Sequence, residues 1–572
     1  MSTETAGRAI VRALEAEGVT HVYGLPGGHV LSIYDALCER PVIRHVLARH
    51  EQTAASMAAA HAQLSGEPGI CLVTAGPGAT NLLTAVAEAH VGCLPMVILA
   101  GRGSTATTHR GASQEVATER IFAPVTKWAV RVDRAELVTD VVRQAFAIAR
   151  GGRPGPVYID LPRDVLDTEI EVREYMPAGP SPQPQADTNA IDAAVEALLG
   201  ADRPLIVAGG GVIMAGAASK VPLLAEMLGA PVLTSLAGRG SIPDDHPLSA
   251  GGLGAHRTRL SKRLLSEADL VLGLATRFEE METNWSPSAM PAANAKYIQV
   301  DIEPAEIGRS VPADIGVVGD VGMVLDQISA ALTQRGAGPR DWAPVSEIAA
   351  ELERLESEAT EMVERQQRPM HPLVPIRAFR DALPRNATTA IDVGCLAQHM
   401  AGAMPYFRVF ESRATIVPSS FYGMGFAAAA LPAARLVRPD RPAVCFVGDG
   451  SFQMVMSVLP VAAEHKLGVT WCVLDDGALG SIRDIQEYRF DNRIIGTEFE
   501  FQPDLAMLAR ACGCYGERVD DPAAVDGAVK RALEANENGV PAVLDFAVAR
   551  ERLLGTLEHY SFYPDGVVEK AR

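Results

Sequence analysis

The sequence lacks any run of basic residues. Its 572 residues include 51 Lys and Arg against 70 Asp and Glu, which gives a formal net charge of −19. Proteins that bind nucleic acids or anionic membrane surfaces do so through clustered positive charge. The charge balance therefore argues against both kinds of partner.

Long hydrophobic stretches are also missing. No segment of about eighteen uncharged apolar residues occurs, so we expect no membrane-spanning helix. The first residues, MSTETAGRAIVRALEAEGV, contain acidic side chains and no apolar core of the kind found in secretory signals. Both absences favour a cytoplasmic protein.

The eight cysteines show no metal-binding spacing. Cys512 and Cys514 are two positions apart, but no second pair completes a zinc-finger pattern. Several cysteines, such as Cys445 in AVCFVGDG, lie in apolar runs that are typical of buried strands. This usage fits free thiols in a reducing compartment.

Short apolar runs alternate with longer helical patterns along most of the chain. Continuous apolarity is what strands buried on both faces of a sheet need. The candidate strands are GICLVTAG (69–76), PMVILAG (95–101), GPVYIDLP (155–162), PLIVAGGG (204–211), ADLVLGLA (268–275), KYIQVDIE (296–303), PAVCFVGDG (442–450) and VTWCVLDD (469–476). Helices between such strands predict an α/β fold with doubly wound parallel sheets and right-handed crossovers.

Two breaks divide the chain. MPAGPSPQPQADTN (176–189) is rich in proline and polar residues and predicts an extended linker. A second break begins at RGAGPRDWAP (335–344), before the charged helical pattern SEIAAELERLESEATEMVERQQ. We therefore predict three α/β domains, at residues 1–175, 190–335 and 370–560.

An acidic residue begins a helical stretch of small residues, LARHEQTAASMAAA (47–60). A helix with small residues on every face is typically buried. Glu51, in its first turn, could complement the positive end of the helix dipole. It could instead be a buried carboxylate with a chemical task. The stretch alone leaves both interpretations open.

Acidic residues follow two of the candidate strands. Asp449 comes at the end of the strand in FVGDGSF (446–452), and Asp476 lies 27 residues later, after the next strand. A strand, a helix and a strand fit between them, so both acids should lie at one edge of a parallel sheet. With the backbone carbonyl of Ala478, they would suit Mg²⁺. The alternative is a pair of turn-forming acids.

Glycine-rich turns follow three other strands. VYGLPGGHV (22–30) and TAGPGATN (74–81) could be ordinary strand-to-helix turns or ligand-binding loops. GGGVIMAG (209–216) is a looser candidate for a dinucleotide phosphate site, which would indicate a nicotinamide or flavin oxidoreductase.

These features together resemble the thiamine diphosphate enzymes of the acetolactate synthase-like superfamily. The matching blocks occur in order over nearly the whole chain. Besides GDGSF with its acid 27 residues on, they are GVTHVYGLPGGHVLSIYDAL (18–37), RHEQTAASMA (49–58), VTAGPGATNLLTAVAEAH (73–90), APVTKW (123–128), GRPGPVYIDLP (152–162), GRGSIPDDHP (238–247), TRF (276–278), QVDIEPAEIG (299–308) and GMGFA (423–427). The resemblance implies a pyrimidine-binding first domain, a central Rossmann-like domain and a third domain that binds diphosphate and Mg²⁺.

The resemblance also assigns roles to individual residues. Glu51 matches the glutamate that bonds to the aminopyrimidine of thiamine diphosphate and favours its reactive tautomer. His29 and Gln114 are the other implied catalytic residues. Tyr422 and Met424 match positions that hold the aminopyrimidine and bend the cofactor. The implied metal ligands are Asp449, Asp476 and the Ala478 carbonyl. The remaining implied cofactor contacts are Pro26, Thr74, Gly78, Asn81, Cys395, Leu396, Gly448, Gly450, Ser451, Leu479 and Gly480.

The implied reaction is decarboxylation of a 2-oxo acid followed by carboligation. An acyloin lyase or carboligase that acts on aldehydes, as in benzaldehyde lyase-like enzymes, and a simple 2-oxo acid decarboxylase are alternatives. A thiamine-fold subunit that has lost catalysis is a fourth possibility. The family pattern implies a homodimer or homotetramer with active sites between subunits.

Several residues depart from the acetolactate synthase pattern. His29 stands where those enzymes usually have alanine, whereas the benzaldehyde lyase-like enzymes have histidine. Ser113, the Cys395-Leu396 pair and Ile485 replace residues of the usual substrate and diphosphate sites. The pocket is therefore expected to differ from that of a standard biosynthetic synthase.

Two further departures concern cofactors. Asp476 replaces an asparagine, and its extra negative charge should weaken diphosphate binding unless the metal or a nearby cation compensates. In the central domain, Arg277 matches a flavin contact but GLGAHRT (252–258) departs from the flavin loop. FAD is a possible cofactor that the sequence leaves open.

Overall fold

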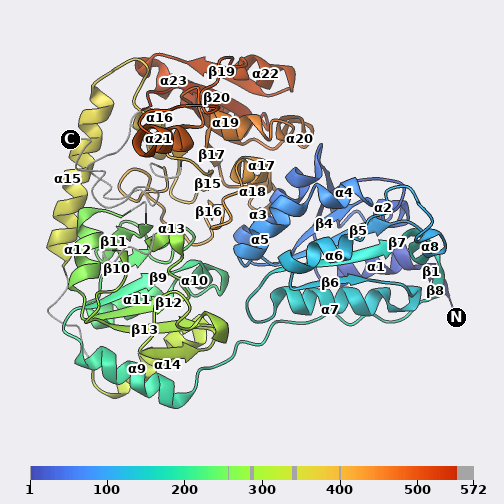
Figure 1. Cartoon of the computed structure of the whole chain (residues 1–572), viewed down its shortest axis with the longest axis horizontal. Helices are drawn as coiled ribbons and strands as arrows, with labels where there is room; N and C mark the ends of the chain where they lie inside the picture. Colours follow the sequence, from blue (N-terminus) through green and yellow to red (C-terminus); the bar gives the residue numbers. More distant parts are fainter. Residues whose placement is uncertain (1, 255–256, 284–288, 338–343, 398–400, 551–572) are drawn as a thin grey trace. The chain divides into compact units, whose positions relative to one another are not determined.

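The computed structural model describes residues 2–254, 257–283, 289–337, 344–397 and 401–550. These residues form three six-stranded parallel sheets, and β1 (Thr3–Thr5) pairs with β8 (Glu169–Glu171) in a small antiparallel sheet. The predicted α/β class is therefore confirmed. Two compact units are present, and the elements of each are labelled in Figure 1.

The first unit comprises Met1–Pro182, Phe421–Pro439 and Val455–Leu467. Its sheet has the order β3-β2-β4-β5-β7-β6. The strands are β2 (His21–Leu25), β3 (Arg44–Leu47), β4 (Gly69–Val73), β5 (Met96–Arg102), β6 (Trp128–Arg131) and β7 (Pro156–Pro162). Its helices are α1 (Ala6–Ala16), α2 (Leu31–Cys38), α3 (Glu51–Ser65), α4 (Pro77–Thr80), α5 (Leu83–Val91), α6 (Thr118–Phe122), α7 (Val138–Arg150), α8 (Arg163–Asp167), α17 (Phe426–Ala430), α18 (Pro432–Val437) and α20 (Val458–Glu464).

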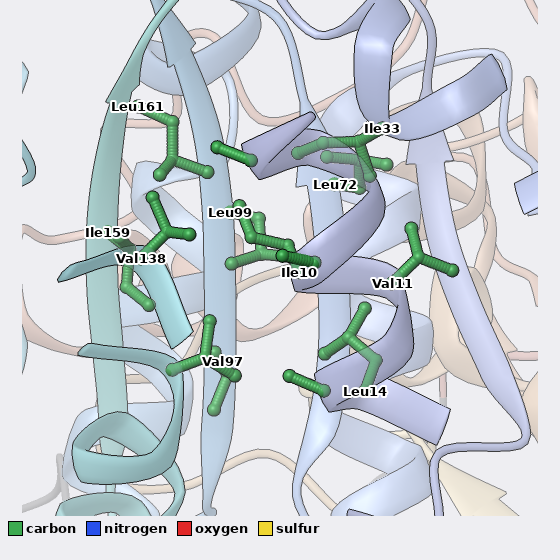
Figure 2. Packing of buried hydrophobic residues seen from close by; sticks show 14 of the residues in the cluster. Ile10, Val11, Leu14, Ile33, Leu72, Val97, Leu99, Val138, Ile159 and Leu161 are labelled. Atoms are coloured by element: carbon green, nitrogen blue, oxygen red, sulfur yellow. The ribbon is translucent and has the colours of Figure 1, made fainter. Parts of the chain in front are cut away.

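The core of this unit forms where α1 packs on the sheet. Ile10 and Leu14 of α1 face Leu72, Val97 and Leu99 of β4 and β5 (Figure 2). The strands β4, β5 and β7 are buried at every residue, as their continuous apolar sequences predict.

Helix α3 is surrounded by other parts of the first unit. Every residue from Thr53 to Ala60 is buried, and the helix packs against β2, β4, α5, α17 and α18. Small side chains permit this close approach, so the predicted burial is confirmed. The helix runs from Glu51 to Ser65 and is capped by Gly66, whose positive φ of 84° is accessible to glycine.

The second unit contains the other two large sheets. One has the order β11-β10-β9-β12-β13-β14 and the other β16-β15-β17-β18-β20-β19. The strands are β9 (Pro204–Ala208), β10 (Val232–Thr234), β11 (Ser249–Gly252), β12 (Leu270–Leu274), β13 (Lys296–Asp301), β14 (Ile315–Val318), β15 (Thr388–Ile391), β16 (Thr415–Ile416), β17 (Ala443–Gly448), β18 (Thr470–Asp475), β19 (Tyr515–Val519) and β20 (Ala542–Ala547). Its helices are α9 (Thr188–Gly200), α10 (Gly210–Met214), α11 (Lys220–Leu228), α12 (Arg259–Glu267), α13 (Glu280–Thr283), α14 (Val321–Gln334), α15 (Val345–Glu364), α16 (Leu373–Ala382), α19 (Asp449–Gln453), α21 (Gly480–Arg489), α22 (Leu505–Ala511) and α23 (Val525–Glu537).

All eight candidate strands are present, and each pairs in parallel with its neighbours. Residues 172–187 have no regular structure, in agreement with the predicted linker. Of the second break, residues 338–343 lie outside the described residues, and the charged pattern after it forms α15. The exact domain limits stay a prediction.

The glycine run in GGGVIMAG has a packing explanation. A Cβ atom on Gly209 would lie 2.2 Å from the carbonyl oxygen of Ala275, and one on Gly211 would lie 2.5 Å from the Cβ of Ala275. The backbone after β9 thus approaches the backbone after β12 too closely for any side chain. The glycines are needed for this packing whether or not a nucleotide binds.

No helix in the described part of the chain is long and apolar enough to cross a membrane.

Candidate active site

The implied pyrimidine-site residues of the first unit gather at the carboxyl edge of its sheet. Pro26 and His29 follow β2, Glu51 begins α3 after β3, and Thr74 follows β4. These three strands are neighbours in the sheet. Loops at this edge of an α/β sheet are where ligands bind.

Glu51 has the placement that both of its interpretations require. It occupies the first turn of α3, and its side chain is buried, with 7% of the residue exposed. The amide Nδ2 of Asn81 donates a hydrogen bond to Oε2 over 2.8 Å. A Cβ on Gly78 would lie 2.7 Å from Cγ2 of Thr74 and 3.5 Å from Oε1 of Glu51, so the glycine lets its turn pack closely against both residues. A buried, oriented acceptor of this kind fits the aminopyrimidine of thiamine diphosphate.

His29 lies beside Thr74, at the same edge. Its Nδ1 is 3.4 Å from Thr74 Oγ1. Burial and the nearby Arg163 lower the pKa of this imidazole. The ring is therefore neutral at neutral pH, with one nitrogen able to donate and the other to accept.

Gln114 contacts the turn that carries Gly78. Its backbone has a φ of 62°, a left-handed value that is uncommon for residues other than glycine. A Cβ on Gly76 would lie 2.8 Å from the Cβ of Gln114, so only glycine allows this approach. Strained backbone of this kind is often found at functional sites.

The first unit also contains the segment with Tyr422 and Met424. The backbone N–H of Gly423, between them, donates to Oε2 of Glu88 over 2.9 Å. Glu88 is buried in α5 and was not among the predicted site residues. Its only sequence signal is an acid within the small-residue stretch LLTAVAEAH. The bond positions the segment that the resemblance places against the pyrimidine.

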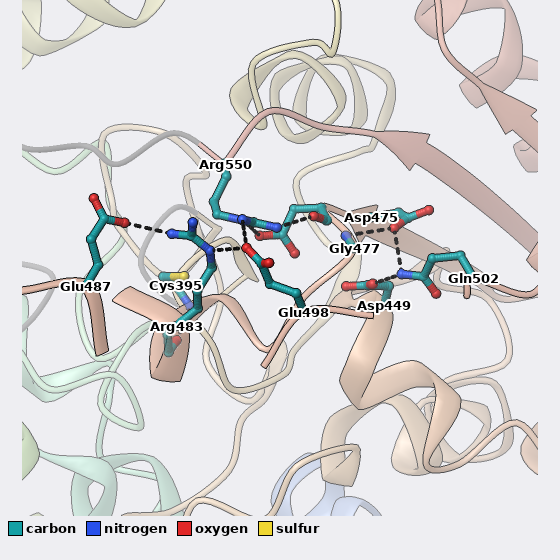
Figure 3. Close-up of polar contacts among 11 residues, drawn as sticks. Cys395, Asp449, Asp475, Gly477, Arg483, Glu487, Glu498, Gln502 and Arg550 are labelled. Atoms are coloured by element: carbon teal, nitrogen blue, oxygen red, sulfur yellow. Dashed lines mark hydrogen bonds and ion pairs between the residues drawn. The ribbon is translucent and has the colours of Figure 1, made fainter. Parts of the chain in front are cut away.

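The second unit brings acidic residues together where β17 and β18 end side by side. Gly448 pairs with Leu474 in register, so Asp449 and Asp475 follow at the same edge. Gln502 donates its amide to Oδ2 of Asp449 and, over 3.1 Å, to Oδ1 of Asp475 (Figure 3). Neither Asp475 nor Gln502 was foreseen from the sequence.

Asp449 has the properties of a cation ligand. Burial, followed by the charges of Asp475 and Asp476, raises its pKa to about 8. Its Oδ1 is buried without a hydrogen-bond partner among the described residues. A divalent cation would satisfy this oxygen and offset the excess negative charge. Within the described residues, no group of three or more His, Cys, Asp and Glu side chains is arranged to hold a metal, but the predicted set has only two side chains and a carbonyl.

Asp476 has a different partner. Its Oδ2 lies 3.2 Å from Nε of Arg550, and the Arg550 Nη2 donates to the Asp476 carbonyl over 2.9 Å. Burial raises the pKa of Asp476 to about 6, and Arg550 opposes this rise. The structure therefore brings Asp449 and Asp476 to one sheet edge, while their shared metal role stays a prediction.

The loop after β18 is held by a short antiparallel bridge. Leu479 N–H donates to Thr497 O over 2.7 Å, and Phe499 N–H donates to Gly477 O over 2.9 Å. Neither bond uses the carbonyl of Ala478, the implied third metal ligand. Other implied contacts line this region: Gly450 lies against Leu479, Ser451 is buried, and Gly480 adjoins Oδ2 of Asp476.

The Cys395-Leu396 pair lies near the same loop. The backbone N–H of Cys395 donates to Ser481 Oγ over 3.0 Å. Burial, with a smaller effect of Asp484, raises the pKa of the Cys395 thiol to about 12, so the thiol is neutral. The Leu396 side chain packs in the hydrophobic core, which leaves its backbone as the part that can contact a ligand.

Three models of known protein families match successive parts of the chain. Residues 4–121 match the N-terminal TPP binding domain of thiamine pyrophosphate enzymes, residues 191–328 the central domain, and residues 392–546 the C-terminal TPP binding domain. Thiamine pyrophosphate is a synonym of thiamine diphosphate.

Curated relatives cover nearly the whole chain. A probable acetolactate synthase large subunit of Methanococcus aeolicus is 34% identical over 555 residues, which cover 94% of this chain and 91% of the relative. The acetolactate synthase isozyme 3 large subunit of Escherichia coli is 33% identical, with 96% and 95% covered. The chain belongs to the acetolactate synthase-like family of thiamine pyrophosphate enzymes. It is thus a thiamine diphosphate-dependent enzyme, as the sequence motifs indicate.

Proposed function

We propose that this enzyme decarboxylates a 2-oxo acid and transfers the resulting acyl group to a second carbonyl compound. Relatives named acetolactate synthase over nearly their full length support the reaction type. The observation that carries the proposal is Glu51, a buried carboxylate oriented by Asn81 and adjacent to the glycine turn that carries Gly78.

Different residues of this chain have different roles in the proposed reaction. Glu51 would hydrogen-bond to the aminopyrimidine and share a proton with it, and Tyr422 and Met424 would hold the ring in place. Asp449, Asp476 and the Ala478 carbonyl would hold Mg²⁺ for the diphosphate. When bound, thiamine diphosphate supplies a nucleophilic carbon and an electron sink for chemistry next to a carbonyl.

His29 favours one alternative, an acyloin lyase or carboligase that uses aldehydes. Its neutral imidazole next to Thr74 could orient a carbonyl or transfer a proton. Ser113 and Ile485, which replace larger residues of the usual pocket, also support an unusual second substrate.

We further propose a homodimer or homotetramer, since the family pattern builds each site from two subunits. Light scattering on the purified protein tests the oligomer. None of the eight cysteines forms a disulfide, which supports a reducing, cytoplasmic environment. Whether the protein binds FAD is a question for experiment. Arg277, which matches a flavin contact, forms an ion pair with Glu279 over 3.0 Å. A yellow colour of the purified protein would reveal FAD.

Proton NMR of the protein with thiamine diphosphate, Mg²⁺ and a panel of 2-oxo acids tests the function, with and without added aldehydes. We expect loss of a 2-oxo acid and appearance of a hydroxyketone or a 2-hydroxy-3-oxo acid. Aldehyde as the only product would indicate a decarboxylase. Cleavage of an added acyloin, without turnover of any 2-oxo acid, would establish the lyase instead.

A further inference from the structure

Arg550 contacts both the side chain and the backbone carbonyl of Asp476. It follows β20, the strand next to β18 in the sheet. Besides the two contacts with Asp476, its Nη1 lies 3.3 Å from Oε1 of Glu498, a residue of the bridge that holds the loop after β18 (Figure 3). The guanidinium of Arg550 thus links Asp476 to Glu498 of the bridge.

The surroundings of Asp476 are strongly acidic. Its side chain is 4% exposed, and Asp449, Asp475 and Asp484 are its acidic neighbours. Two of the nearby arginines have other partners: Arg518 pairs with Asp475 and Asp545, and Arg483 with Glu487 and Glu498. Among the residues that the structure describes, Arg550 is the cation that contacts the Asp476 carboxylate.

We propose that Arg550 is a positioning residue that neutralises Asp476 and thereby allows an anionic diphosphate to bind at this loop. The inference rests on the proposed thiamine diphosphate and Mg²⁺ site. An amide at position 476, the usual residue of the family, carries no charge and needs no such partner. The Asp476–Arg550 pair would reproduce this neutrality with two residues.

Calorimetric titration of thiamine diphosphate into the full-length protein at saturating Mg²⁺ tests the pair. Arg550→Gln leaves the Asp476 carboxylate uncompensated and should weaken cofactor binding about tenfold or more. Asp476→Asn alone keeps an oxygen ligand and leaves the charge of Arg550 without its anion, so cofactor binding should be no weaker than in the wild type. In the double variant the charge is absent, so its affinity should return to within about threefold of the wild type.

Arg483→Gln is the matched control, because Arg483 contacts the same Glu498 but not Asp476. We expect its cofactor affinity to stay within about threefold of the wild type. Thermal unfolding without cofactor reports separately on the fold of each variant. If Arg550→Gln is insoluble while the double variant folds and binds, the pairing is supported.

Two results would overturn the inference alone: unchanged binding by Arg550→Gln, or a double variant as weak as, or less stable than, Arg550→Gln. The second would mean that Arg550 contacts the cofactor directly or serves the fold independently of Asp476. A wild-type protein that binds no thiamine diphosphate would instead overturn the proposed function, and this inference with it.

Discussion

At the scale of single residues, Glu51 is placed so that its two oxygens have different surroundings. Oε2 accepts the hydrogen bond from Asn81, and Oε1 lies next to Gly78. One oxygen is thus oriented by an amide of the protein, while the other lies against a turn that has no side chain. The proposed role of Glu51 toward the aminopyrimidine falls to this second oxygen.

Glu51→Gln should keep the shape of the side chain but lose its capacity to hold a proton. We expect turnover of the best 2-oxo acid to fall about a hundredfold or more. The NMR assay gives the rate, and calorimetry checks that thiamine diphosphate still binds. Glu67→Gln, an exposed acid just beyond the same helix, is the control. Wild-type turnover by Glu51→Gln would exclude the assigned role.

The predictability of the site differs from residue to residue. Glu51 was a candidate from sequence because a carboxylate before a run of small residues is locally unusual. Gln502 and Arg550 lie 53 and 74 positions from the aspartates they contact, so no local pattern could reveal them. Their roles follow from strand order, which brings β17, β18 and β20 together.

At the scale of elements, the close packing of α3 on β4 depends on Gly69. A Cβ on Gly69 would lie only 1.9 Å from the carbonyl oxygen of Ala58 in α3. The contact is between backbones, so no side-chain rotation can relieve it. The distance between helix and strand therefore depends on the absence of a side chain at residue 69.

Gly69→Ala should push α3 away from β4. We expect the free energy of unfolding to fall by about 2 kcal/mol or more, as for other overpacked cores. Gly28→Ala, at a position with nothing within 4 Å of the new Cβ, should change it by less than about 0.5 kcal/mol. Urea unfolding followed by circular dichroism compares the two. Equal stability of both variants would contradict the packing argument.

Three partly buried histidines link the stability of β2, β3 and α3 to pH. Burial lowers the pKa of His21, His45 and His61 to about 4, helped by Arg44, His465 and His21 respectively. In the unfolded chain a histidine has a pKa of about 6.5. The unfolded state therefore binds more protons between these values, and stability falls as pH decreases from about 6.5 toward 4.

His45→Gln should reduce this pH dependence. We expect the loss of unfolding free energy between pH 7.5 and 5.5, measured in urea, to be smaller in the variant than in the wild type. His109→Gln, in an exposed loop, should show the wild-type loss. An unchanged loss in His45→Gln would mean that other groups cause the acid sensitivity.

Burial also explains which elements the sequence predicts. The central strands β4, β5, β7 and β17 have continuous apolar sequences and were predicted. The edge strands β6, WAVR, and β19, YGERV, carry charges and are only partly buried, so no such pattern marks them. An edge strand has a neighbouring strand on one side only. It can therefore keep polar residues that reach water, without loss of hydrogen bonding.

At the scale of the whole molecule, the linker is anchored at both of its ends. Glu17 accepts hydrogen bonds from the Tyr175 hydroxyl over 2.8 Å and from the Ala178 N–H over 2.7 Å. On the other side, Pro184 accepts a bond from the Asp320 N–H over 2.8 Å. The part of the linker that lies between the two anchors is therefore shorter than the whole segment without regular structure.

Glu17→Ala should release the first anchor. Trypsin should then cleave after Arg173 several times faster than in the wild type, because proteases need a locally unfolded chain. Gel electrophoresis and mass spectrometry identify the fragments. Glu15→Ala, in the last turn of α1, removes an ion pair with Arg40 and is the control. Equal cleavage of both variants would show that Glu17 does not restrain the linker.

The two-unit organisation has a consequence for how the protein is made. Helix α3 ends at Ser65, but α17 and α18, which pack against it, begin only at Phe426 and Pro432. At ribosomal speeds of about 5–20 residues per second, these helices follow α3 after roughly 20–70 seconds. Throughout that interval the nascent chain carries a small-residue helix without its final cover. Between the synthesis of Glu51, the proposed catalytic acid, and the completion of its surroundings, about two-thirds of the polypeptide is translated.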